Sequence, residues 1–385
     1  MAKLFRITTV PISVEKLLGN QLTYMNGFFD VTAISSSDNG SLQRVGEKLQ
    51  VKTYSLEMTR QITPIKDLQS LWLMYKYLKK EKPEIVHTHT PKAGLIGMMA
   101  AKLAGVKIRL HTVAGLPLME TSGFKRKVLN QVEKLTYNCA TNVYPNSKGL
   151  YNFILEEKLG KTDKLKVIGN GSTNGIDVSY FDPSLFSEEA KLDLKNKLSI
   201  SNHDFVFVFV GRLVKDKGIN ELVSAFKKLN AQNVKLLLVG PYESELDPLE
   251  ESTLSEINNN KNIITVGFQK DVRPYFAISD ALVFPSYREG FPNVVLQALA
   301  MGLPAIVSDI NGCNEIITDQ ENGIIVPPKS ESYIQQAILL LLDQAFYNRL
   351  QSNARTSIMK YRQEYIWELL KENYERLLIS ENLTF

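Results

Sequence analysis

The stretch from Leu282 to Ile310 constrains the fold of this 385-residue chain more than any other. An apolar run at 281–284 predicts a strand, and glycine and proline mark the loop that follows it. Residues 294–301 have the apolar spacing of a helix, and 305–307 predicts a second strand. This order presents the first N–H groups of a helix at the carboxyl end of a strand, where an anion is favoured.

A single carboxylate, Glu289, lies in that loop. A carboxylate does not help to hold a phosphate, but it can accept hydrogen bonds from a polyol. We expect Asn293 to be the N-cap of the following helix. The alternative is that Glu289 only caps this helix.

Short β-rich runs alternate with helical patterns along the whole chain, which predicts α/β domains with doubly wound parallel sheets. The expected strands are 4–10, 31–34, 51–54, 85–89, 107–112, 142–144, 205–210, 234–239, 263–266, 281–284 and 305–307. The expected helices include 14–25, 65–81, 92–103, 121–137, 271–278, 331–342 and 361–378.

The sequence Glu-Gly-Phe-Pro at 289–292, followed by an Ala-x-x-x-Gly-x-Pro helix end at 298–304, resembles the retaining glycosyltransferases of family 4. The resemblance covers nearly the whole chain and is strongest to the subgroup that assembles bacterial surface polysaccharides and lipid-linked glycans. It implies the GT-B fold, with two Rossmann-like domains facing across a cleft. It also implies metal-independent transfer of a hexose or N-acetylhexosamine from a nucleotide sugar, expected to be UDP-linked, to a saccharide acceptor.

The resemblance implies that the chain is divided into three segments. We expect an acceptor-binding domain at 1–181, a nucleotide-sugar domain at 182–360, and a last helix at 361–385 that crosses back to the first domain.

The family pattern has two glutamates separated by seven residues, and here the second position is Gln297. By resemblance, Glu289 orients the donor hexose and Gln297 meets the ribose. Arg212 and Lys217 lie on a glycine-bounded loop and would bind the donor diphosphate. The remaining residues expected at the donor are Gly211, Gly240, Phe268, Gly290, Phe291, Pro292, Asn293 and Val294.

His111 is a further candidate for catalysis. Many relatives have Thr-Val-His-Gly at the end of this strand, where the histidine touches the donor sugar, but that position here is Ala114. His111 either substitutes for the missing histidine or is structural, and the sequence favours neither reading.

On the acceptor side we expect Thr9, Pro11, His89 and Lys92. His87 and His89 alternate on one strand, so both should point the same way. A metal site would need a third ligand, which the sequence does not offer, and no Asp-x-Asp motif is present. We therefore expect no metal and no cofactor, the nucleotide sugar being a substrate.

The charge is unevenly distributed: residues 1–180 carry 25 Lys/Arg and 14 Asp/Glu, whereas residues 181–385 carry 20 and 27. A basic first half suits an anionic partner, and we expect a polyprenyl-diphosphate-linked acceptor and peripheral contact with an anionic membrane. The basic, partly apolar segment at 122–129 is the candidate contact, with an ordinary core helix as the alternative. Nucleic-acid-binding motifs are absent.

No run of about 20 apolar residues predicts a membrane span. The first residues lead directly into a strand rather than a secretory leader, and Cys139 and Cys313 form no disulfide framework. We expect a cytoplasmic protein at the inner face of the cytoplasmic membrane.

Three other functions remain open. A GT-B sugar-nucleotide epimerase would use the same donor site, and a non-catalytic nucleotide-sugar-binding protein would explain Gln297 and Ala114. An NAD dehydrogenase is disfavoured because no strand leads into Gly-x-Gly-x-x-Gly and then a helix near either domain's start.

Overall fold

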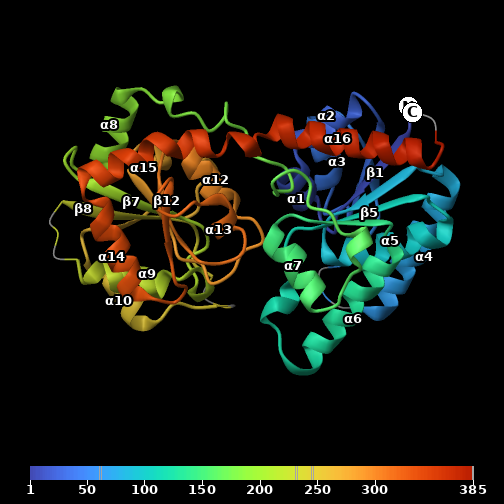
Figure 1. The fold of residues 1–385 in the computed structure, drawn as a ribbon, viewed down its shortest axis with the longest axis horizontal. Helices are drawn as coiled ribbons and strands as arrows, with labels where there is room; N and C mark the ends of the chain where they lie inside the picture. The colour runs from blue at the N-terminus through green and yellow to red at the C-terminus, as the bar shows by residue number, and fades with distance from the viewer. Residues whose placement is uncertain are drawn as a thin grey trace. The chain divides into compact units, whose positions relative to one another are not determined.

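The computed structural model describes residues 1–59, 61, 63–229, 231, 233–243, 245 and 247–383. These residues form two compact units, one of 1–175 with 363–385 and the other of 176–362. Each unit contains one six-stranded parallel sheet with helices around it (Figure 1). The expected class of two doubly wound parallel-sheet domains is thereby confirmed, whereas the functions expected of the two domains stay predictions.

The sheet of the first unit has the strand order β3-β2-β1-β4-β5-β6. Its strands are β1 Lys3–Ile7, β2 Asp30–Ser35, β3 Lys52–Ser55, β4 Ile85–Thr88, β5 Ile108–Val113 and β6 Asn142–Pro145. The chain moves outward from β1 to β3 and then returns to β4 beside β1. Ligands of such sheets bind beyond the carboxyl ends of the strands at this reversal of strand order.

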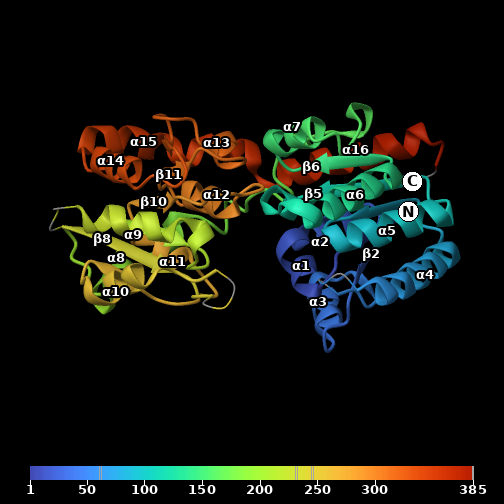
Figure 2. The ribbon, with the colours of Figure 1, turned by 90° about the horizontal axis from the view of Figure 1, so that it is seen from below.

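Helices cover both faces of the first sheet. On one face, α4 Pro64–Glu81, α5 Pro91–Ala104 and α6 Gly123–Cys139 lie side by side (Figure 2). On the other, α16 Gln363–Ser380 packs beside α2 Asn20–Asn26, and α3 Ser41–Leu49 lies next to α2. The helix expected at 14–25 is broken: α1 Pro11–Ser13 and a π-helical turn at Val14–Leu18 precede α2, and Gly19 separates the turn from α2. The helix α7 Lys148–Glu156 follows β6.

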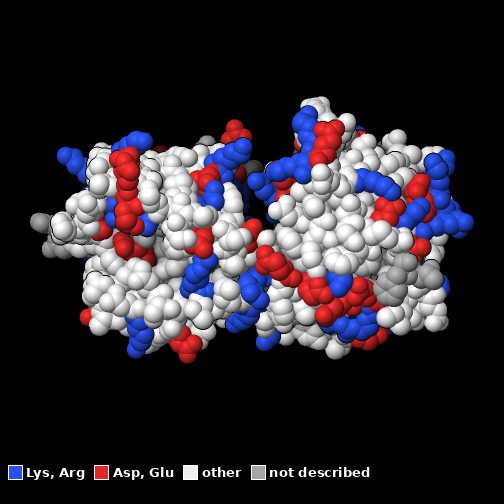
Figure 3. Space-filling model, turned by 90° about the horizontal axis from the view of Figure 1, so that it is seen from above, with Lys and Arg blue, Asp and Glu red and all other residues white. Residues whose placement is uncertain are grey.

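The last helix, α16, belongs to the first unit although it follows the second along the chain. Trp367 donates its indole N–H to Asn174 Oδ1 at 2.7 Å, and the Tyr374 hydroxyl lies 2.6 Å from His87 Nδ1. The acidic residues of α16 therefore lie on the first unit, where Figure 3 shows carboxylates gathered along this helix. They reduce the basic excess that the first half of the sequence alone suggests.

The sheet of the second unit has the order β12-β11-β10-β7-β8-β9, so its reversal lies between β7 and β10. Its strands are β7 Phe205–Val210, β8 Val234–Val239, β9 Ile263–Thr265, β10 Ala281–Phe284, β11 Ala305–Ser308 and β12 Gly323–Val326. The middle residues of β7 are fully buried, as a strand covered on both faces requires. The sequence analysis missed β12, whose run begins at a glycine, a residue that is depleted in strands.

The helices of this unit are α8 Glu188–Lys197, α9 Ile219–Lys227, α10 Glu251–Asn259, α11 Arg273–Ala277, α12 Asn293–Ala300, α13 Cys313–Ile316, α14 Glu331–Leu341 and α15 Gln344–Ser357. None of the helices in the described part of the chain is both long and apolar enough to span a bilayer.

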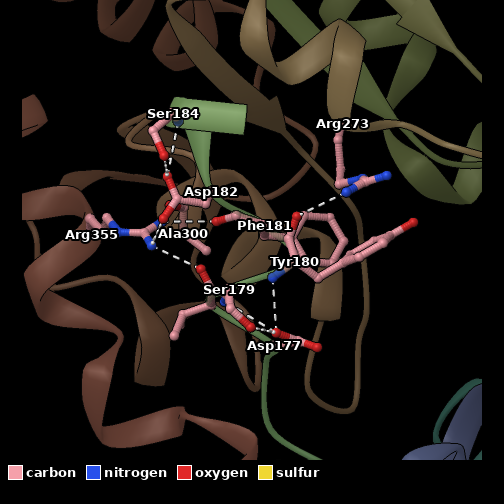
Figure 4. A network of polar contacts seen from close by, with 10 residues as sticks. Asp177, Ser179, Tyr180, Phe181, Asp182, Ser184, Arg273, Ala300 and Arg355 are labelled. Carbon is pink, nitrogen blue, oxygen red and sulfur yellow. Dashed lines mark hydrogen bonds and ion pairs between the residues drawn. The ribbon is translucent and has the colours of Figure 1, made fainter. Parts of the chain in front are cut away.

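Arginines hold the first residues of the second unit in place (Figure 4). Arg355 forms an ion pair with Asp182 at 2.9 Å and donates to the carbonyl oxygens of Val178 and Phe181, each at 2.8 Å. Arg273 stacks on the Tyr180 ring at 3.5 Å and donates to its carbonyl oxygen. The segment after residue 175 is thus anchored to its own unit by several charge-assisted contacts.

Gly218 brings the loop after β7 against the loop after β10. Its φ of +72° is left-handed, and a Cβ atom there would lie 2.2 Å from the carbonyl oxygen of Pro285. Only glycine permits both the conformation and this close approach.

We predict that Gly218→Ala destabilises the second unit more than Gly302→Ala. Gly302 has a φ of +83°, but a Cβ there meets no atom within 4 Å. Gly302→Ala should cost about 1 kcal/mol for the left-handed backbone alone. Gly218→Ala should add about 1 to 3 kcal/mol for the steric clash. Calorimetric unfolding of the two variants measures the difference, and equal melting temperatures would contradict the close packing of the two loops.

Candidate active site

Two loops meet at the strand-order reversal of the second unit. One loop, 211–218, follows β7, and the other, 285–292, follows β10. The backbone N–H of Tyr287 donates to the carbonyl oxygen of Asp216 at 2.9 Å, and Arg288 forms an ion pair with Asp216 at 2.8 Å. These contacts hold the loops together at the place where a parallel α/β sheet binds its ligand.

Lys217 and Glu289 form an ion pair between these loops. Lys217 Nζ lies 2.5 Å from Glu289 Oε1, and the two side chains are only 16% and 18% exposed. An ammonium group has three N–H donors and a carboxylate has two oxygens, so this pair leaves positions for a ligand on both residues. The structure therefore brings together two of the four expected catalytic residues.

Arg212 lies on the same loop but is directed to a different partner. Its guanidinium forms an ion pair with Glu243 at 2.7 Å, and its side chain is 46% exposed. An exposed ion pair of this kind contributes little stability, so Arg212 can exchange Glu243 for a ligand at small cost.

The expectation that Asn293 caps α12 is wrong. Asn293 is the first helical residue, and the N-cap is Pro292, which has no side-chain acceptor to offer. Without that acceptor, first-turn N–H groups of α12 lack a side-chain partner and suit an anion. Asn311 instead steadies the preceding loop, because its side-chain N–H₂ donates to the carbonyl oxygens of Glu289 and Gly290.

The other expected donor residues lie in several environments. Gln297 is partly buried on α12, and Val294 is partly exposed on its first turn. Phe291 is buried against the Tyr361 ring at 5.4 Å, whereas Phe268 is 74% exposed after β9. Gly211 and Gly240 follow β7 and β8.

In the first unit, Thr9 and His89 follow β1 and β4, the two strands at the reversal of strand order. The backbone N–H of Thr9 donates to Thr90 Oγ1 at 3.0 Å, and the backbone N–H of His89 donates to the carbonyl oxygen of Ile7 at 3.0 Å. Pro11 starts α1 close by in the chain. Lys92 differs from the other expected acceptor residues, because Asp67 pairs with its ammonium group at 2.5 Å and compensates its charge.

His87 and His89 point the same way, as expected, with their rings 4.2 Å apart. His89 accepts a hydrogen bond at Nε2 from the Nε–H of Arg6, at 3.0 Å. Arg6 is fully buried, and burial lowers its pKa. Among the described residues no three His, Cys, Asp or Glu side chains are grouped as metal ligands would be, and the expected lack of a metal stays a prediction.

His111 is buried inside the first unit. Its Nδ1 lies 2.8 Å from Thr88 Oγ1, and a Cβ atom at Gly94 would lie 2.5 Å from its ring. Burial lowers the pKa of His111 to about 4, so the imidazole is neutral at pH 7. It also lines a small cavity together with His89 and Glu133.

The sequence analysis did not single out two of the polar residues in this region. In the sequence, Arg6 is a single cation within an apolar strand, and Glu133 is a single acid on an amphipathic helix. Both are buried in the structure, with exposed fractions of 0% and 5%. Only the tertiary structure distinguishes them from surface charges.

Comparisons with known proteins decide the family. Residues 190–357 match the model of glycosyl transferases group 1, and residues 23–171 match that of a glycosyl transferase 4-like domain. Over 380 residues the chain is 34% identical to the capsular polysaccharide biosynthesis glycosyltransferase CapM of Staphylococcus aureus, covering 98% of this chain and 97% of the relative. The chain belongs to the family 4 glycosyltransferases. The expected family is thereby confirmed.

This glycosyltransferase is also similar to a relative whose name specifies a donor, an acceptor and a linkage. It is 32% identical to the Escherichia coli UDP-Gal:alpha-D-GlcNAc-diphosphoundecaprenol alpha-1,3-galactosyltransferase, over 78% of this chain and 77% of that one. A crystal structure of a glycosyltransferase from Rickettsia africae superposes with a TM-score of 0.81 at 21% identity, covering 98% of each chain. The structural likeness supports the expected GT-B fold.

We predict that His111 makes the first unit of this glycosyltransferase sensitive to acid. The unfolded chain binds a proton on His111 near the ordinary pKa of 6.5, but the folded protein binds it only near pH 4. Between these values the unfolded state holds more protons, so the free energy of unfolding falls as pH decreases, by at most about 1.4 kcal/mol per pH unit. His111→Gln should flatten this slope by about 1 kcal/mol per pH unit.

Urea unfolding followed by tryptophan fluorescence measures that slope, because Trp72 and Trp367 both belong to the first unit. His203→Gln, which removes an exposed histidine of the second unit, is the matched control. Equal slopes for His111→Gln and the unaltered protein would contradict a neutral, buried His111.

Proposed function

We propose that this glycosyltransferase moves a hexose or N-acetylhexosamine from a UDP-sugar to a polyprenyl-diphosphate-linked saccharide during surface polysaccharide assembly. Two relatives support the proposal. The Staphylococcus aureus relative is described as a capsular polysaccharide biosynthesis enzyme, and the Escherichia coli relative as a transferase from UDP-Gal to a diphosphoundecaprenol-linked sugar.

The Lys217–Glu289 ion pair is the observation that carries the proposal. A nucleotide sugar has a diphosphate beside a polyhydroxylated ring, and this pair places a cation beside a carboxylate. Lys217 suits the diphosphate, and Glu289 suits the sugar hydroxyls. Because Lys217 neutralises Glu289, the carboxylate can lie close to the donor phosphates at a reduced repulsive cost.

In the proposed reaction, the bond between the anomeric carbon and the diphosphate breaks as negative charge grows on the leaving phosphate. Lys217, Arg212 and the first N–H groups of α12 would stabilise that charge, which is electrostatic catalysis in a preorganised site. We propose, from the family resemblance, that the leaving phosphate takes the acceptor proton and that attack on the same face retains the configuration. The protein would then supply no covalent nucleophile and no metal.

We predict that Lys217→Met weakens UDP binding about 10- to 100-fold, because a hydrogen bond to a charged group contributes about 1.5 to 3 kcal/mol. Lys215→Met is the matched control: it removes the same charge from the same loop, at an exposed position outside the ion pair. Thermal stabilisation by UDP, GDP and ADP measures binding, since a ligand of the native state raises the melting temperature.

Glu289→Gln separates the binding of the diphosphate, proposed for Lys217, from the binding of the sugar hydroxyls, proposed for Glu289. It should leave UDP binding nearly unchanged but remove the difference in affinity between UDP and the preferred UDP-sugar. If none of the three nucleotides stabilises the protein, the proposed donor site is contradicted. A non-catalytic protein whose nucleotide site no longer binds would then be favoured. Turnover of a UDP-sugar without any acceptor, giving an isomeric UDP-sugar, would favour the epimerase.

We also propose that the first unit contacts an anionic membrane through the α4–α6 surface. We define this surface by exposed apolar residues with cations beside them: Ile65, Leu68, Trp72 and Phe124 with Lys66, Lys76, Lys79, Lys125 and Lys127. Ile65 and Phe124 are 87% and 82% exposed, and both lie in the first turn of a helix. Exposed apolar side chains beside lysines suit the interface of an anionic bilayer.

We predict that the double variant Ile65→Ser, Trp72→Ser lowers binding to phosphatidylcholine–phosphatidylglycerol vesicles at least about tenfold, because both side chains would be buried in the interface. Ile379→Ser is the control, since Ile379 is 64% exposed on α16, which packs beside α2 on the other face of the sheet. Vesicle flotation measures binding. Equal flotation of both variants, or equal binding to pure phosphatidylcholine, would contradict this membrane surface.

A further inference from the structure

Tyr287 forms hydrogen bonds on both sides of Lys217. Its backbone N–H donates to the carbonyl oxygen of Asp216, the residue before Lys217, at 2.9 Å. Its hydroxyl donates to Glu221 Oε1 at 2.6 Å, and Glu221 lies in the first turn of α9, four residues after Lys217. Glu289 comes two residues after Tyr287 in the other loop. Tyr287 therefore joins the loop that carries Glu289 to the chain before and after Lys217.

The hydroxyl of Tyr287 makes a strong contact. A distance of 2.6 Å is in the short range of hydrogen bonds from a hydroxyl to a carboxylate, which are roughly twice as strong as those between neutral groups. Burial and the Glu221 carboxylate raise the pKa of Tyr287, so the hydroxyl keeps its proton and is the donor. The other carboxylate oxygen, Glu221 Oε2, is buried and has no partner among the described residues. The hydrogen bond from Tyr287 therefore offsets part of the cost of enclosing this carboxylate.

The other side-chain contacts between the two loops are less durable. Lys217 and Glu289 would share their ion pair with the donor, because the proposed contacts with the diphosphate and the sugar use the same ammonium and carboxylate groups. The ion pair of Asp216 with Arg288 is screened by water and salt, since the arginine side chain is 44% exposed. The hydrogen bond of the Tyr287 hydroxyl is partly buried and takes part in no proposed contact with the donor. It therefore still holds the loops together when the donor is bound.

We propose that Tyr287, held by Glu221, is a positioning residue that fixes Glu289 relative to Lys217. With Tyr287 in place, the Glu289 carboxylate meets the hydroxyls of the transferred sugar while Lys217 holds the diphosphate. In this role Tyr287 touches no atom of the donor. The inference rests on the proposed function and adds a requirement to it. The sugar and the diphosphate must be held at a set distance, because a displacement of about 1 Å can lower a rate about 100-fold.

Calorimetric titration of Tyr287→Phe with UDP and with a UDP-sugar tests the inference, because this variant removes only the hydroxyl. The probes are UDP-glucose, UDP-galactose, UDP-N-acetylglucosamine and UDP-N-acetylgalactosamine, and the one that binds the unaltered protein most tightly is compared with UDP. We expect the affinity for that UDP-sugar to fall about 10-fold, as when a hydrogen bond to a charged group is lost. The affinity for UDP should stay nearly unchanged, because Lys217 keeps its place on its own loop.

Tyr347→Phe is the matched control, because it removes a tyrosine hydroxyl from the same unit at a distance from the donor loops. The Tyr347 hydroxyl accepts a hydrogen bond from the Gln351 side chain at 2.8 Å. Its ring lies 5.2 Å from that of Phe205, the first residue of β7, whereas the donor loops follow the last residues of β7 and β10. Tyr347→Phe should leave the affinities for UDP and for the UDP-sugar unchanged.

A double-mutant cycle with Glu289→Gln distinguishes positioning from a general loosening of the unit. If Tyr287 acts through Glu289, Tyr287→Phe should lower the UDP-sugar affinity no further in the Glu289→Gln protein. A general loosening would instead add its loss to that of Glu289→Gln, and it would lower the affinity for UDP as well. Either of these two results would overturn the inference.

Two variants of Glu221 complete the test, and they also serve if Tyr287→Phe fails to fold. Glu221→Gln keeps an oxygen that can accept from the Tyr287 hydroxyl, so its UDP-sugar affinity should match that of the unaltered protein. Glu221→Met removes the acceptor without leaving a buried carboxylate unpaired, and it should reproduce the loss expected of Tyr287→Phe. An unchanged UDP-sugar affinity in Glu221→Met would overturn the inference. Absence of UDP binding in the unaltered protein would instead contradict the proposed donor site itself.

Discussion

The reversal of strand order in each parallel sheet is the constraint on which the candidate sites depend. Parallel strands all end at the same edge, and the reversal places two strands side by side that are distant in the sequence. Lys217 and Glu289 follow β7 and β10 and form an ion pair across that junction. Thr9 and Thr90 follow β1 and β4 and form hydrogen bonds at the equivalent place in the other sheet. Each unit thus brings distant parts of the chain together by the same geometry.

Much of the fold could be predicted, because buried parallel strands are short apolar runs that stand out between helices. The strand at 205–210 was predicted with its observed bounds, whereas β12, which begins at a glycine, was missed. The Asn293 cap was predicted from residue preference alone, but the chain reaches its helical conformation one residue earlier. Residue preference takes no account of tertiary contacts on a tight loop, such as the hydrogen bonds that Asn311 donates to the carbonyl oxygens of Glu289 and Gly290.

The candidate site was predictable to the extent that its residues lie near each other in a recognisable motif. Glu289 and Lys217 were predicted from their loops, and the structure brings them into contact. The sequence left the two readings of His111 equal, because a strand pattern does not say how deeply a ring is buried. Glu133 was missed because a single acid on an amphipathic helix is usually solvated, and only packing shows that this one is enclosed.

The place of α16 has a consequence for how the protein is made. The second unit is one continuous segment, but the first unit includes 363–385, which the ribosome adds only after residue 362. During synthesis, the contact of His87 with Tyr374 and that of Asn174 with Trp367 can form only after the whole second unit has been synthesised. Domains commonly fold as they leave the ribosome, in order from the N-terminus. In this chain the order is partly inverted, and the domain that starts first is completed last.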